Sequence, residues 1–432
     1  MLTILTKARA NMDRTAIELF AGVGGFRVGL NGVRSFDEKT GRAIENGPWT
    51  FVWANQWEPS TKKQHAYDCY AARFGKEHAS NVDISLVDKN EIPNHTLLTG
   101  GFPCQDYSVA HPRNSEKGIE GKKGVLWWQI NEILLKKKPS FVLLENVDRL
   151  LKAPSSQRGQ AFGIILRCFN DAGYGVQWRV INAADYGHPQ KRRRTFVFAF
   201  HKSTRYYSKF VKQSRNKSET EVMLSQLMFS QGFPCVLKNG AKTRETIIDK
   251  EHYADLVEVS NKFSFPFGNI GYSVKHHVIT TDVVANCSIQ PKTLGECLDC
   301  ESVPDFCYKT NFEKFKYLKG AKRIQRTAKN GHIYTYSEGP IPFPDHLDQP
   351  GRTMLTSEGT TNRSSHYILD PVSQKYRILT PVECERLDEF PDNWTNTGMP
   401  QRFRYFIAGN ALVTGLIAEM GKTILKIIEG ER

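Results

Sequence analysis

The chain has 432 residues, and its 59 Lys and Arg exceed its 45 Asp and Glu, which gives a net charge of +14. With 40% hydrophobic and 24% charged residues the composition is globular and excludes general disorder, and no apolar run reaches the roughly 18–20 residues that a membrane span needs. The nine scattered cysteines are not typical of a disulfide framework and favour a reduced, cytoplasmic location. The positive surplus favours a polyanionic partner, nucleic acid or an acidic membrane surface, over a role in solubility alone.

The first two hundred residues alternate between short apolar runs and helix-prone stretches. The expected strands lie at 15–20, 50–55, 96–100, 140–145, 176–182 and 195–200, and the expected helices at 61–74, 125–137 and 160–172. Such alternation predicts a parallel α/β sheet with helices on both faces.

The pattern changes after about His201. Lys, Ser, Asn, Gly and short β-prone pieces prevail until about Lys375, which predicts a second, irregular, β-rich domain. Helical pattern returns at 380–389, where Thr380 and Pro381 are typical of a helix start, and at 411–428, which is amphipathic. We therefore predict a first domain at 1–200, an insertion at 201–375 and a C-terminal segment at 376–432 that packs back on the first domain.

Glycines follow the first predicted strand. Gly22 and Gly24, directly after Phe20, allow a ligand to approach the backbone of a strand–turn–helix segment closely. Arg27 occupies the third glycine position of the dinucleotide-binding fingerprint, so this loop is not that motif. A purely structural tight turn is the alternative interpretation.

Polar residues also follow the second strand. Gln56, Trp57 and Glu58 come directly after the strand at 50–55, and Asp83 and Ile84 offer a further contact. In a nucleotide-like site, such residues bond ribose hydroxyls and an aromatic ring covers the base. The alternative is an ordinary strand end with an exposed tryptophan.

Cys104 follows a predicted strand and a Gly-Gly turn, the end of an α/β sheet at which ligands bind. Pro103 stiffens the approach to it. An activated thiolate here could act as a nucleophile, although a lone cysteine is more often structural. The Gly- and Lys-rich stretch at 111–124 suits a loop that closes over a polyanion.

Two later segments carry charge at strand ends. Glu145 and Asn146 end a buried strand, where a carboxylate can bond the ring nitrogen and exocyclic amine of a heterocycle. Gln190 to Arg194 precedes another apolar strand, so Arg192 and Arg194, as alternate residues, could both point into a site. A solvated basic surface is the alternative for this run.

In this order, these segments resemble the DNA (cytosine-5) methyltransferase family. The resemblance lies in six motifs, which are Phe20-Ala-Gly-Val-Gly-Gly25, Pro103-Cys104-Gln105, Glu145-Asn-Val147, Gln190-Lys-Arg192-Arg-Arg194, the segment from Arg377 to Pro391, and Gly409-Asn410-Ala-Leu412. Any one of them could arise by chance, whereas all six in the family's order and spacing form a specific signal.

The resemblance implies a class I S-adenosylmethionine-dependent methyltransferase sheet, which is Rossmann-like, with an inserted small, β-rich target-recognition domain. It implies S-adenosyl-L-methionine as the cofactor, bound by Phe20, Gly22, Gly24, Gln56, Trp57, Glu58, Asp83, Ile84 and Asn410. The family usually has a glutamate before the tryptophan to hold the ribose, and here that residue is Gln56. An amide bonds hydroxyls more weakly than a carboxylate does, so whether Gln56 or Glu58 holds the ribose stays open.

The resemblance also implies the reaction. The chain would methylate C5 of a flipped-out cytosine in a specific duplex sequence, through a covalent bond between Cys104 and C6. Glu145, Arg192 and Arg194 would assist Cys104 in catalysis. The residues expected to bind the DNA substrate are Pro103, Gln105, Ser108 and Asn146, together with Lys322 and Arg323 of the insertion.

The insertion has two features of its own. A basic run from Lys314 to Lys329 contains no acidic residue, which favours contact with phosphates over a solvated surface. A loose cluster of cysteines, Cys287, Cys297, Cys300 and Cys307, leaves structural zinc open, but its spacing is irregular and we expect no metal.

Two alternative functions were weighed. Relatives that methylate cytosine in tRNA usually carry Cys-Phe-Thr in the insertion, and this sequence does not. A catalytically dead DNA-binding module would not need the intact set of Cys104, Glu145 and Arg192. The expected protein is therefore a cytoplasmic monomer of prokaryotic or phage restriction–modification type, which acts on double-stranded DNA beside a separate restriction endonuclease and without a membrane.

Overall fold

The computed structural model describes residues 12–102, 125–299, 301, 303–328 and 331–431. Pro103, Cys104, Gln105 and Ser108, all predicted site residues, lie outside the described residues. The chain divides into two compact units. Unit 1 comprises Met1–Asn182, Arg193–Ser288 and Leu416–Arg432, and unit 2 comprises Ala183–Arg192 and Ile289–Gly415.

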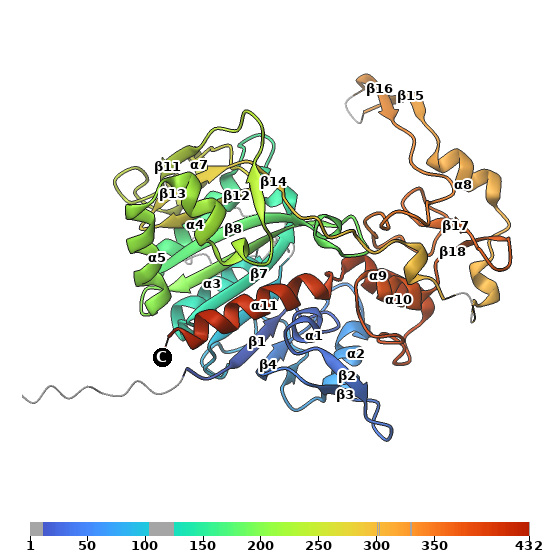
Figure 1. Ribbon diagram of the computed structural model, residues 1–432, viewed down its shortest axis with the longest axis horizontal. Coiled ribbons are helices and arrows are strands. Elements are labelled where there is room, and N and C mark those ends of the chain that lie inside the picture. The colour runs from blue at the N-terminus through green and yellow to red at the C-terminus, as the bar shows by residue number, and fades with distance from the viewer. Residues whose placement is uncertain (1–11, 103–124, 300, 302, 329–330, 432) are drawn as a thin grey trace, which may run out of the picture. The chain divides into compact units, whose positions relative to one another are not determined.

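Unit 1 is organised around a ten-stranded sheet (Figure 1). In spatial order its strands are β11 (Arg244–Ile247), β13 (His277–Thr281), β12 (Ile270–Val274), β8 (Tyr174–Asn182), β9 (Arg193–His201), β7 (Phe141–Val147), β6 (Leu97–Gly101), β1 (Thr15–Leu19), β4 (Thr50–Asn55) and β5 (Ala79–Ser80). The five strands from β7 to β5 are parallel to one another, whereas β9, β8, β12, β13 and β11 pair antiparallel. The sheet is therefore mixed, and the prediction of a purely parallel sheet was wrong for its second half.

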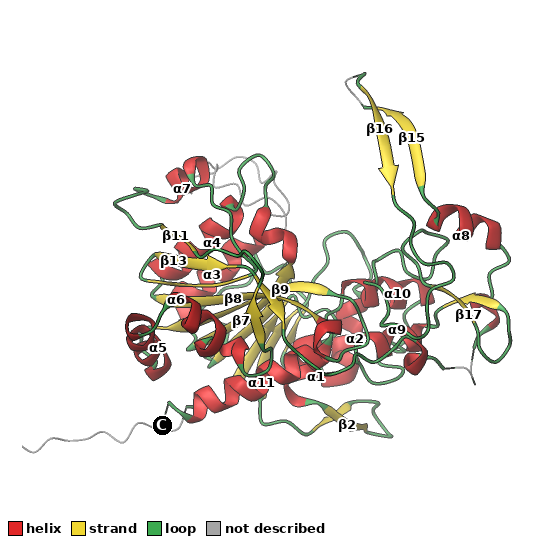
Figure 2. Ribbon diagram, turned by 45° about the horizontal axis from the view of Figure 1, so that its top comes forward, coloured by secondary structure: helices red, strands yellow, loops and turns green. Residues whose placement is uncertain are grey.

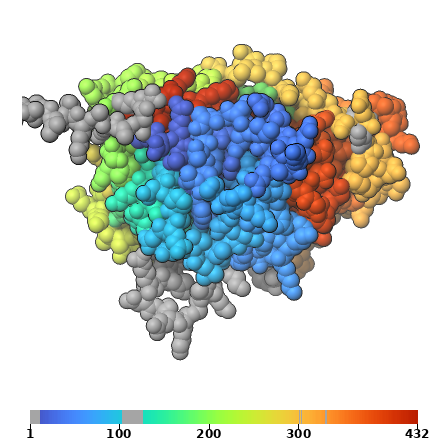
Figure 3. Space-filling model, turned by 90° about the horizontal axis from the view of Figure 1, so that it is seen from below, coloured from blue at the N-terminus to red at the C-terminus, as the bar shows by residue number. Residues whose placement is uncertain are grey.

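Helices cover the sheet. Their bounds are α1 (Gly25–Asn31), α2 (His65–Phe74), α3 (Val125–Lys137), α4 (Gln160–Asp171), α5 (Arg205–Asn216), α6 (Glu219–Glu221), α7 (Leu256–Lys262) and α11 (Thr414–Glu429). Figure 2 shows α4 on one side of the strands and α11 on the other. Two small two-stranded sheets, β2 (Val33–Phe36) with β3 (Ala43–Glu45) and β10 (Cys235–Leu237) with β14 (Val283–Ala285), complete the unit. In the space-filling view, the described residues up to about 100 form a continuous surface, coloured blue to cyan (Figure 3).

The apolar strand residues form the core of unit 1. Leu98 on β6, Leu144 on β7 and Val197 on β9 are almost fully buried, as are Phe162 and Phe169 on α4. This burial explains why the apolar runs located the strands well. β4 and α3 have the predicted bounds, and β1, β6, β7, β8 and β9 begin and end within two residues of theirs. Because the hydrophobic effect scales with buried apolar area, continuous apolar strands are the strongest local signal in the sequence.

The predicted insertion at 201–375 is divided differently in the structure. Residues up to Ser288 belong to unit 1 because β12 hydrogen-bonds to β8, with Ile270 opposite Arg179, and β13 and β11 extend the sheet further. These strands are only four or five residues long, and α5 lies in the region that the sequence predicts to be irregular and β-rich. At the other end, residues 376–415 fall in unit 2, and only the end of the predicted C-terminal segment belongs to unit 1.

Unit 2 contains small elements around a second core. They are α8 (Phe312–Lys319), β15 (Lys322–Thr327), β16 (Ile333–Glu338), β17 (Tyr367–Leu369), β18 (Tyr376–Ile378), α9 (Pro381–Leu387) and α10 (Gln401–Asn410). Short 3₁₀ turns occur in the two units at Asp148–Lys152, Ala183–Tyr186, Met228–Ser230, Gly295–Cys297 and Asp305–Cys307, and a π turn at Val222–Gln226. The predicted start of α9 is confirmed, because Thr380 and Glu383 form a reciprocal capping box.

The predicted helix at 411–428 begins later in the structure. α10 ends at Asn410 and α11 starts at Thr414, so residues 411–413 form a break. The Thr414 hydroxyl donates to the Glu389 carbonyl at 2.7 Å, and the Thr414 amide donates to Asp388. These bonds direct the chain out of one helix and into the next, which the apolar periodicity of the segment does not reveal.

Two absences concern the described residues alone. Among them, no helix combines the length and the apolar character that crossing a membrane requires. Nor does any group of three or more His, Cys, Asp or Glu side chains in this part of the chain lie close enough to hold a metal ion. Cys297 and Cys307 are buried in the core of unit 2, where burial raises the pKa of each thiol to about 11.

Candidate functional site

The glycine loop joins β1 to α1 through left-handed backbone. Phe20, Gly22 and Gly24 have φ angles of 53°, 55° and 88°. A Cβ atom at Gly24 would lie 2.4 Å from a ring atom of Phe74, so that position needs glycine for space as well as for conformation. The sharp turn leaves Phe20 half-exposed at the carboxyl end of β1, where a ligand of an α/β sheet binds.

Gln56 connects this loop to the end of β4. Its side-chain oxygen accepts a hydrogen bond from the Gly22 amide at 2.7 Å, and its amide nitrogen lies 3.5 Å from a carboxylate oxygen of Glu58. Gln56 is buried, whereas the neighbouring Trp57 is 37% exposed. Partial burial raises the pKa of Glu58. The structure thus brings Gly22, Gln56 and Glu58 together at one edge of the sheet.

The segment with Asp83 and Ile84 is attached to the same strand end. The Asn55 side chain donates to the Val82 carbonyl at 2.9 Å, one residue before Asp83. Asp83 accepts bonds from the Ser85 amide and hydroxyl at 2.9 and 2.8 Å, and Ile84 is 2% exposed. β1, β4 and this segment therefore present the predicted cofactor residues of unit 1 along one carboxyl edge.

Glu18 is a site residue that the sequence analysis missed. It is the last residue but one of β1, is 1% exposed, and accepts a bond from the Phe26 amide at 3.0 Å through one carboxylate oxygen. The other oxygen is buried and has no hydrogen-bond partner among the described residues. Burial raises the pKa of Glu18 to about 8. A carboxylate in an otherwise apolar strand, directly before the glycine loop, was the signal that could have found it.

Glu18→Gln is expected to raise stability, increasingly so at higher pH. The native state holds the Glu18 proton up to about pH 8, whereas the unfolded chain releases it near pH 4.5, so native stability falls as the pH rises between these values. The glutamine side chain has the shape of the protonated carboxyl group but does not titrate, so the variant avoids this loss of stability at high pH. We expect the gain in Tm to be near zero at about pH 5 and about 2–5 °C at about pH 9, measured by thermal unfolding. Glu251→Gln, at an exposed site without an ion pair among the described residues, is the control, and an equal gain at both pH values would contradict the prediction.

A second cluster lies on β7 and β9. The Arg194 Nε atom is 2.8 Å from a carboxylate oxygen of Glu145, and both side chains are 15% exposed. The antiparallel register sets this pair, because Val147 lies opposite Arg194 and Glu145 lies two residues earlier on the same face. On its other side, Glu145 lies opposite Gly101, at the end of β6. The structure therefore brings Glu145 and Arg194 together as predicted, beside the strand that leads to Cys104.

Asn146 acts on the same strand end. Its side-chain amide donates to the Phe102 carbonyl at 2.7 Å, and its oxygen accepts from the Val147 amide at 2.9 Å. Asn146 is 2% exposed. Phe102 is also held by packing on Trp127, with ring centroids 5.8 Å apart. Asn146 thus fixes the last described residue before Pro103 and Cys104, and its contact with the substrate stays a prediction.

Arg192 belongs to unit 2, and its side chain is buried there. The guanidinium donates to the carbonyls of Met354 and Gly409, each at 3.1 Å, and Arg192 is 2% exposed. Gln190 supports the same segment, because its amide donates to Asp388 at 2.9 Å and its oxygen accepts from the Met354 amide. Arg192 therefore holds unit 2 together, and the catalytic role that the resemblance implies for it stays a prediction.

The remaining predicted contacts also lie in unit 2. Asn410 is exposed at the last residue of α10, and its contact with the cofactor stays a prediction. Arg323 is exposed on β15, while Lys322 is half-buried and 3.6 Å from Glu338. Lys319, part of the basic run, is fully buried and bonds Asp345 at 2.7 Å, so the expectation of phosphate contact was wrong for this lysine.

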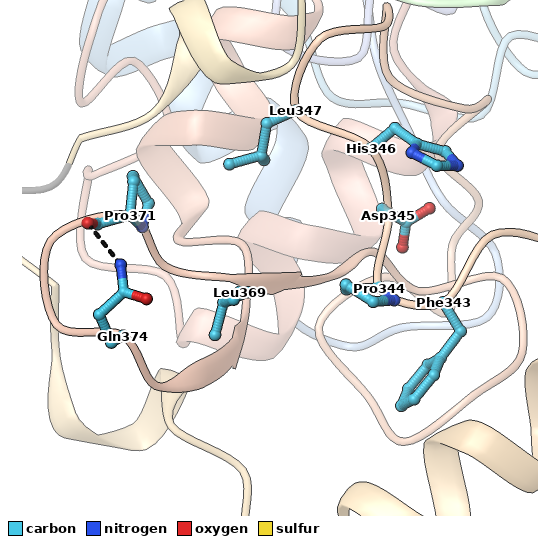
Figure 4. Close-up of a pocket in the computed structure, with 8 residues that line it drawn as sticks. All are labelled: Phe343, Pro344, Asp345, His346, Leu347, Leu369, Pro371 and Gln374. Atoms are coloured by element: carbon cyan, nitrogen blue, oxygen red, sulfur yellow. Dashed lines mark hydrogen bonds between the residues drawn. The ribbon is translucent and has the colours of Figure 1, made fainter.

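Each unit has a pocket among its described residues. A pocket of about 340 Å³ in unit 1 is lined by Trp53, Ser80, Val82, Leu86, Val87, Asp88, Glu91 and Ile92, on the segment that carries Asp83. A pocket of about 420 Å³ in unit 2 is lined by Phe343, Pro344, Asp345, His346, Leu347, Leu369, Pro371 and Gln374 (Figure 4). Asp345 already pairs with Lys319 and Arg352, and Gln374 bonds the Pro371 carbonyl. The second pocket therefore offers no free carboxylate for chemistry.

Solved structures share this fold. A Dnmt2 methyltransferase from S. pombe covers 96% of this chain and 98% of its own at a TM-score of 0.55 and 13% identity. A DNMT2 variant from Spodoptera frugiperda covers 96% and 100% at a TM-score of 0.56 and 14% identity. Together with the mixed central sheet, they define the fold as that of a class I, Rossmann-like methyltransferase.

The sequence comparisons identify the family. The profile of the C-5 cytosine-specific DNA methylase family matches residues 14–426, and the chain belongs to this family. It is 46% identical over 415 residues to the type II methyltransferase M.Sau3AI of Staphylococcus aureus, which covers 95% of both chains. It is 36% identical over 191 residues to M.NgoBI of Neisseria gonorrhoeae, over 44% of this chain and 52% of that one. The chain is a DNA (cytosine-5-)-methyltransferase, as the resemblance predicted.

Proposed function

We propose that this enzyme transfers a methyl group from S-adenosyl-L-methionine to C5 of a cytosine flipped out of duplex DNA, through a transient bond between Cys104 and C6. The observation that carries the proposal is the Glu145–Arg194 pair, 2.8 Å apart on β7 and β9, beside the end of β6. Cys104 comes three residues after Gly101, the β6 residue opposite Glu145.

The residues at the carboxyl edge of unit 1 fit S-adenosyl-L-methionine, whose sulfonium and ammonium groups are positive. The unpartnered, buried oxygen of Glu18 suits a cationic group, because a nearby positive charge favours the ionised form of a buried carboxyl group that otherwise keeps its proton up to about pH 8. Phe20 and Trp57 offer aromatic surface for the adenine, and Gly22 and Gly24 let the ligand approach the backbone. When bound, this cofactor supplies the electrophilic methyl group.

Glu58 is better suited than Gln56 to hold the ribose. The Gln56 oxygen already accepts the Gly22 amide, so its strongest acceptor is occupied by the loop. The Glu58 carboxylate has one long contact, at 3.5 Å, and can accept two hydroxyls. This assignment explains how the chain tolerates glutamine at a position where the family usually has glutamate.

Covalent addition makes cytosine reactive at C5. The Cys104 thiolate would form a bond to C6, and the electron pair of the C5–C6 double bond would then be available at C5. Glu145 would bond N3 and the exocyclic amine and donate a proton as charge grows on the ring. Arg194 would hold the Glu145 carboxyl in place and stabilise the developing charge.

The reaction ends by elimination. After the methyl group is bonded to C5, a base removes the C5 proton, its electron pair restores the C5–C6 double bond, and the Cys104–C6 bond breaks to release the thiolate. None of these steps can occur inside a stacked duplex, so the target base must leave the helix at a cost of a few kcal/mol.

Asn146 and Arg192 would assist as positioning residues. Asn146 holds the Phe102 carbonyl, which anchors the strand end two residues before the nucleophile. Arg192 ties the segment of Gln190 to the loop at Met354 and to the end of α10 at Gly409. Neither role requires contact with the reacting atoms, so conservative substitution should lower stability or cofactor affinity before it alters the chemical step.

The biological setting is proposed from the relatives. M.Sau3AI and M.NgoBI are named type II methyltransferases. We infer that this enzyme protects a specific duplex sequence against a separate restriction endonuclease. Sequence reading would reside in the part of the predicted insertion that belongs to unit 2, residues 289–375, because the catalytic motifs lie outside it.

The decisive experiment is bisulfite sequencing of DNA from cells that express the protein. Methylated cytosines should occur within one short sequence and nowhere else, and labelled methyl groups from S-adenosyl-L-methionine should appear in duplex DNA in vitro. DNA so methylated should resist an endonuclease that cuts the same sequence. Transfer to tRNA but not to DNA would refute the proposal.

A further inference from the structure

The β15–β16 hairpin of unit 2 presents both of its faces to solvent. Its two strands pair over six positions, from Lys322 opposite Glu338 to Thr327 opposite Ile333. Apart from Lys322, Tyr336 and Glu338, which are half-buried, every residue of the two strands is exposed. Within this unit, the hairpin stands away from α8 and from β17 and β18 (Figures 1 and 2). A two-stranded hairpin without a packed face is only marginally stable in water, so it needs an anchor or a partner.

Arg363 anchors the base of the hairpin. Its guanidinium donates to the Leu318 and Gly320 carbonyls at 2.8 and 3.1 Å, before β15, and to the Gly339 carbonyl, after β16. It also lies 3.0 Å from a carboxylate oxygen of Glu338. One side chain thus holds both strands where they leave the body of the unit. Such an anchor keeps the ribbon in a defined direction, as a reading element requires.

Strand alternation gives the ribbon two different faces. The first, which we call the stacking face, consists of Lys322, Ile324, Arg326, Tyr334, Tyr336 and Glu338. The Arg326 guanidinium lies 3.7 Å from the centroid of the Tyr336 ring, and Lys322 lies beside Tyr317 and Glu338. The cations of the stacking face therefore already have partners in the hairpin or next to it.

The opposite face, which we call the reading face, consists of Thr327 and Ile333 near the turn and of four polar residues, Arg323, Gln325, Thr335 and Ser337. Arg323 lies directly opposite Ser337, and Gln325 directly opposite Thr335. All four side chains are exposed, and none hydrogen-bonds another described residue of the protein. They form a compact row of hydrogen-bonding groups on a positively charged ribbon.

We propose that the β15–β16 hairpin enters the major groove of the target duplex with its reading face toward the bases, and that Arg323 and Gln325 read the recognition sequence. This rests on the proposed recognition of a specific duplex by residues 289–375. A major groove about 12 Å wide admits a two-stranded ribbon, whose strands lie about 4.8 Å apart. An arginine there pairs bidentately with guanine and a glutamine with adenine, so the sequence should contain both bases.

Charge supports DNA as the occupant. The described part of the hairpin carries three cations, Lys322, Arg323 and Arg326, against the single carboxylate of Glu338, which Arg363 and Lys322 contact. On the exposed surface of α8, Lys314 and Lys316 add two further cations. A positively charged surface attracts DNA phosphates, which are the same in every sequence. The polar side chains of the reading face add selectivity among bases.

The test compares Arg323→Ala and Gln325→Ala with a matched control, Arg326→Ala. Arg323 and Arg326 are the same residue type on the same strand but lie on opposite faces. Each variant methylates a duplex library in which the positions around the target cytosine are randomised, and bisulfite sequencing gives the preference at each base pair. Circular dichroism and thermal unfolding check that the fold is kept, which the exposure of all three side chains favours.

Arg323→Ala should lower discrimination at one guanine by about 5- to 150-fold, and Gln325→Ala should do so at one adenine, while each still methylates the relaxed sites. Arg326→Ala should weaken binding to all sequences alike, reduce its dependence on salt and leave base preferences unchanged. The reverse pattern, with specificity lost only in Arg326→Ala, would overturn the assignment of the reading face. Unchanged preferences in all three variants would overturn the role of the hairpin. A wild-type enzyme that methylates no duplex would instead refute the proposed function.

Discussion

Cys104→Ala should lower methyl transfer to DNA by at least about 10⁴-fold, because the nucleophile is part of a unit that fails as a whole when one member is lost. Binding to duplex DNA should persist, since phosphate contacts supply much of the affinity. The measurements are label transfer from S-adenosyl-L-methionine and a binding titration on the same duplex. Cys287→Ala is a control of the same type, because Cys287 is only half-buried and lies outside the six family motifs.

Duplex DNA with 5-fluorocytosine at the target separates covalent catalysis from other mechanisms. The adduct normally resolves when the C5 hydrogen leaves as a proton, and fluorine cannot leave in that way. We expect a denaturation-resistant complex only when S-adenosyl-L-methionine is present, and none with Cys104→Ala. Full trapping by that variant would assign the nucleophile to another residue. Tight DNA binding with neither trapping nor turnover in the wild type would indicate a DNA-binding module without activity.

Disrupting the Glu145–Arg194 pair should have the second-largest effect. Glu145→Gln keeps the shape of the side chain but cannot supply a proton, so we expect turnover to fall by about 10²–10⁴-fold with little change in DNA binding. Arg194→Ala should lower turnover as well, because the 2.8 Å contact no longer orients the carboxylate. Single-turnover rates of methyl transfer at several pH values are the measurement.

Arg193 provides the matched control for this pair. It is adjacent in sequence to Arg194, but its side chain is 58% exposed and faces Asp148 at 3.4 Å. Arg193→Ala should therefore retain turnover within a few-fold of the wild type. Equal losses of turnover in Arg193→Ala and Arg194→Ala would attribute the effect to the loss of positive charge in general. If the Glu145→Gln enzyme kept the wild-type rate and pH profile, Glu145 would have no part in proton transfer.

Much of this protein was predictable from local sequence. Continuous apolar runs located β1, β4, β6 and β7 within two residues, because a strand buried on both faces has no polar alternation to obscure it. The Thr380-Pro381 start of α9 was predictable because a capping box involves residues three apart. The family was predictable because its motifs are short and contiguous, so each can be read from neighbouring residues.

Only the tertiary structure decided which polar groups are buried and what they contact. Four features depend on groups that are 8 to 217 residues away in the sequence. They are the environment of the buried Glu18 carboxyl group, the bond from Asn146 to Phe102, and the burial of Arg192 and of Lys319. The sequence assigned residues 201–288 to the insertion, whereas β12, β13 and β11 join the central sheet. The physical reason is that periodicity and motif spacing are properties of neighbours, whereas strand pairing, desolvation and charge compensation are decided by groups that meet only when the chain has folded.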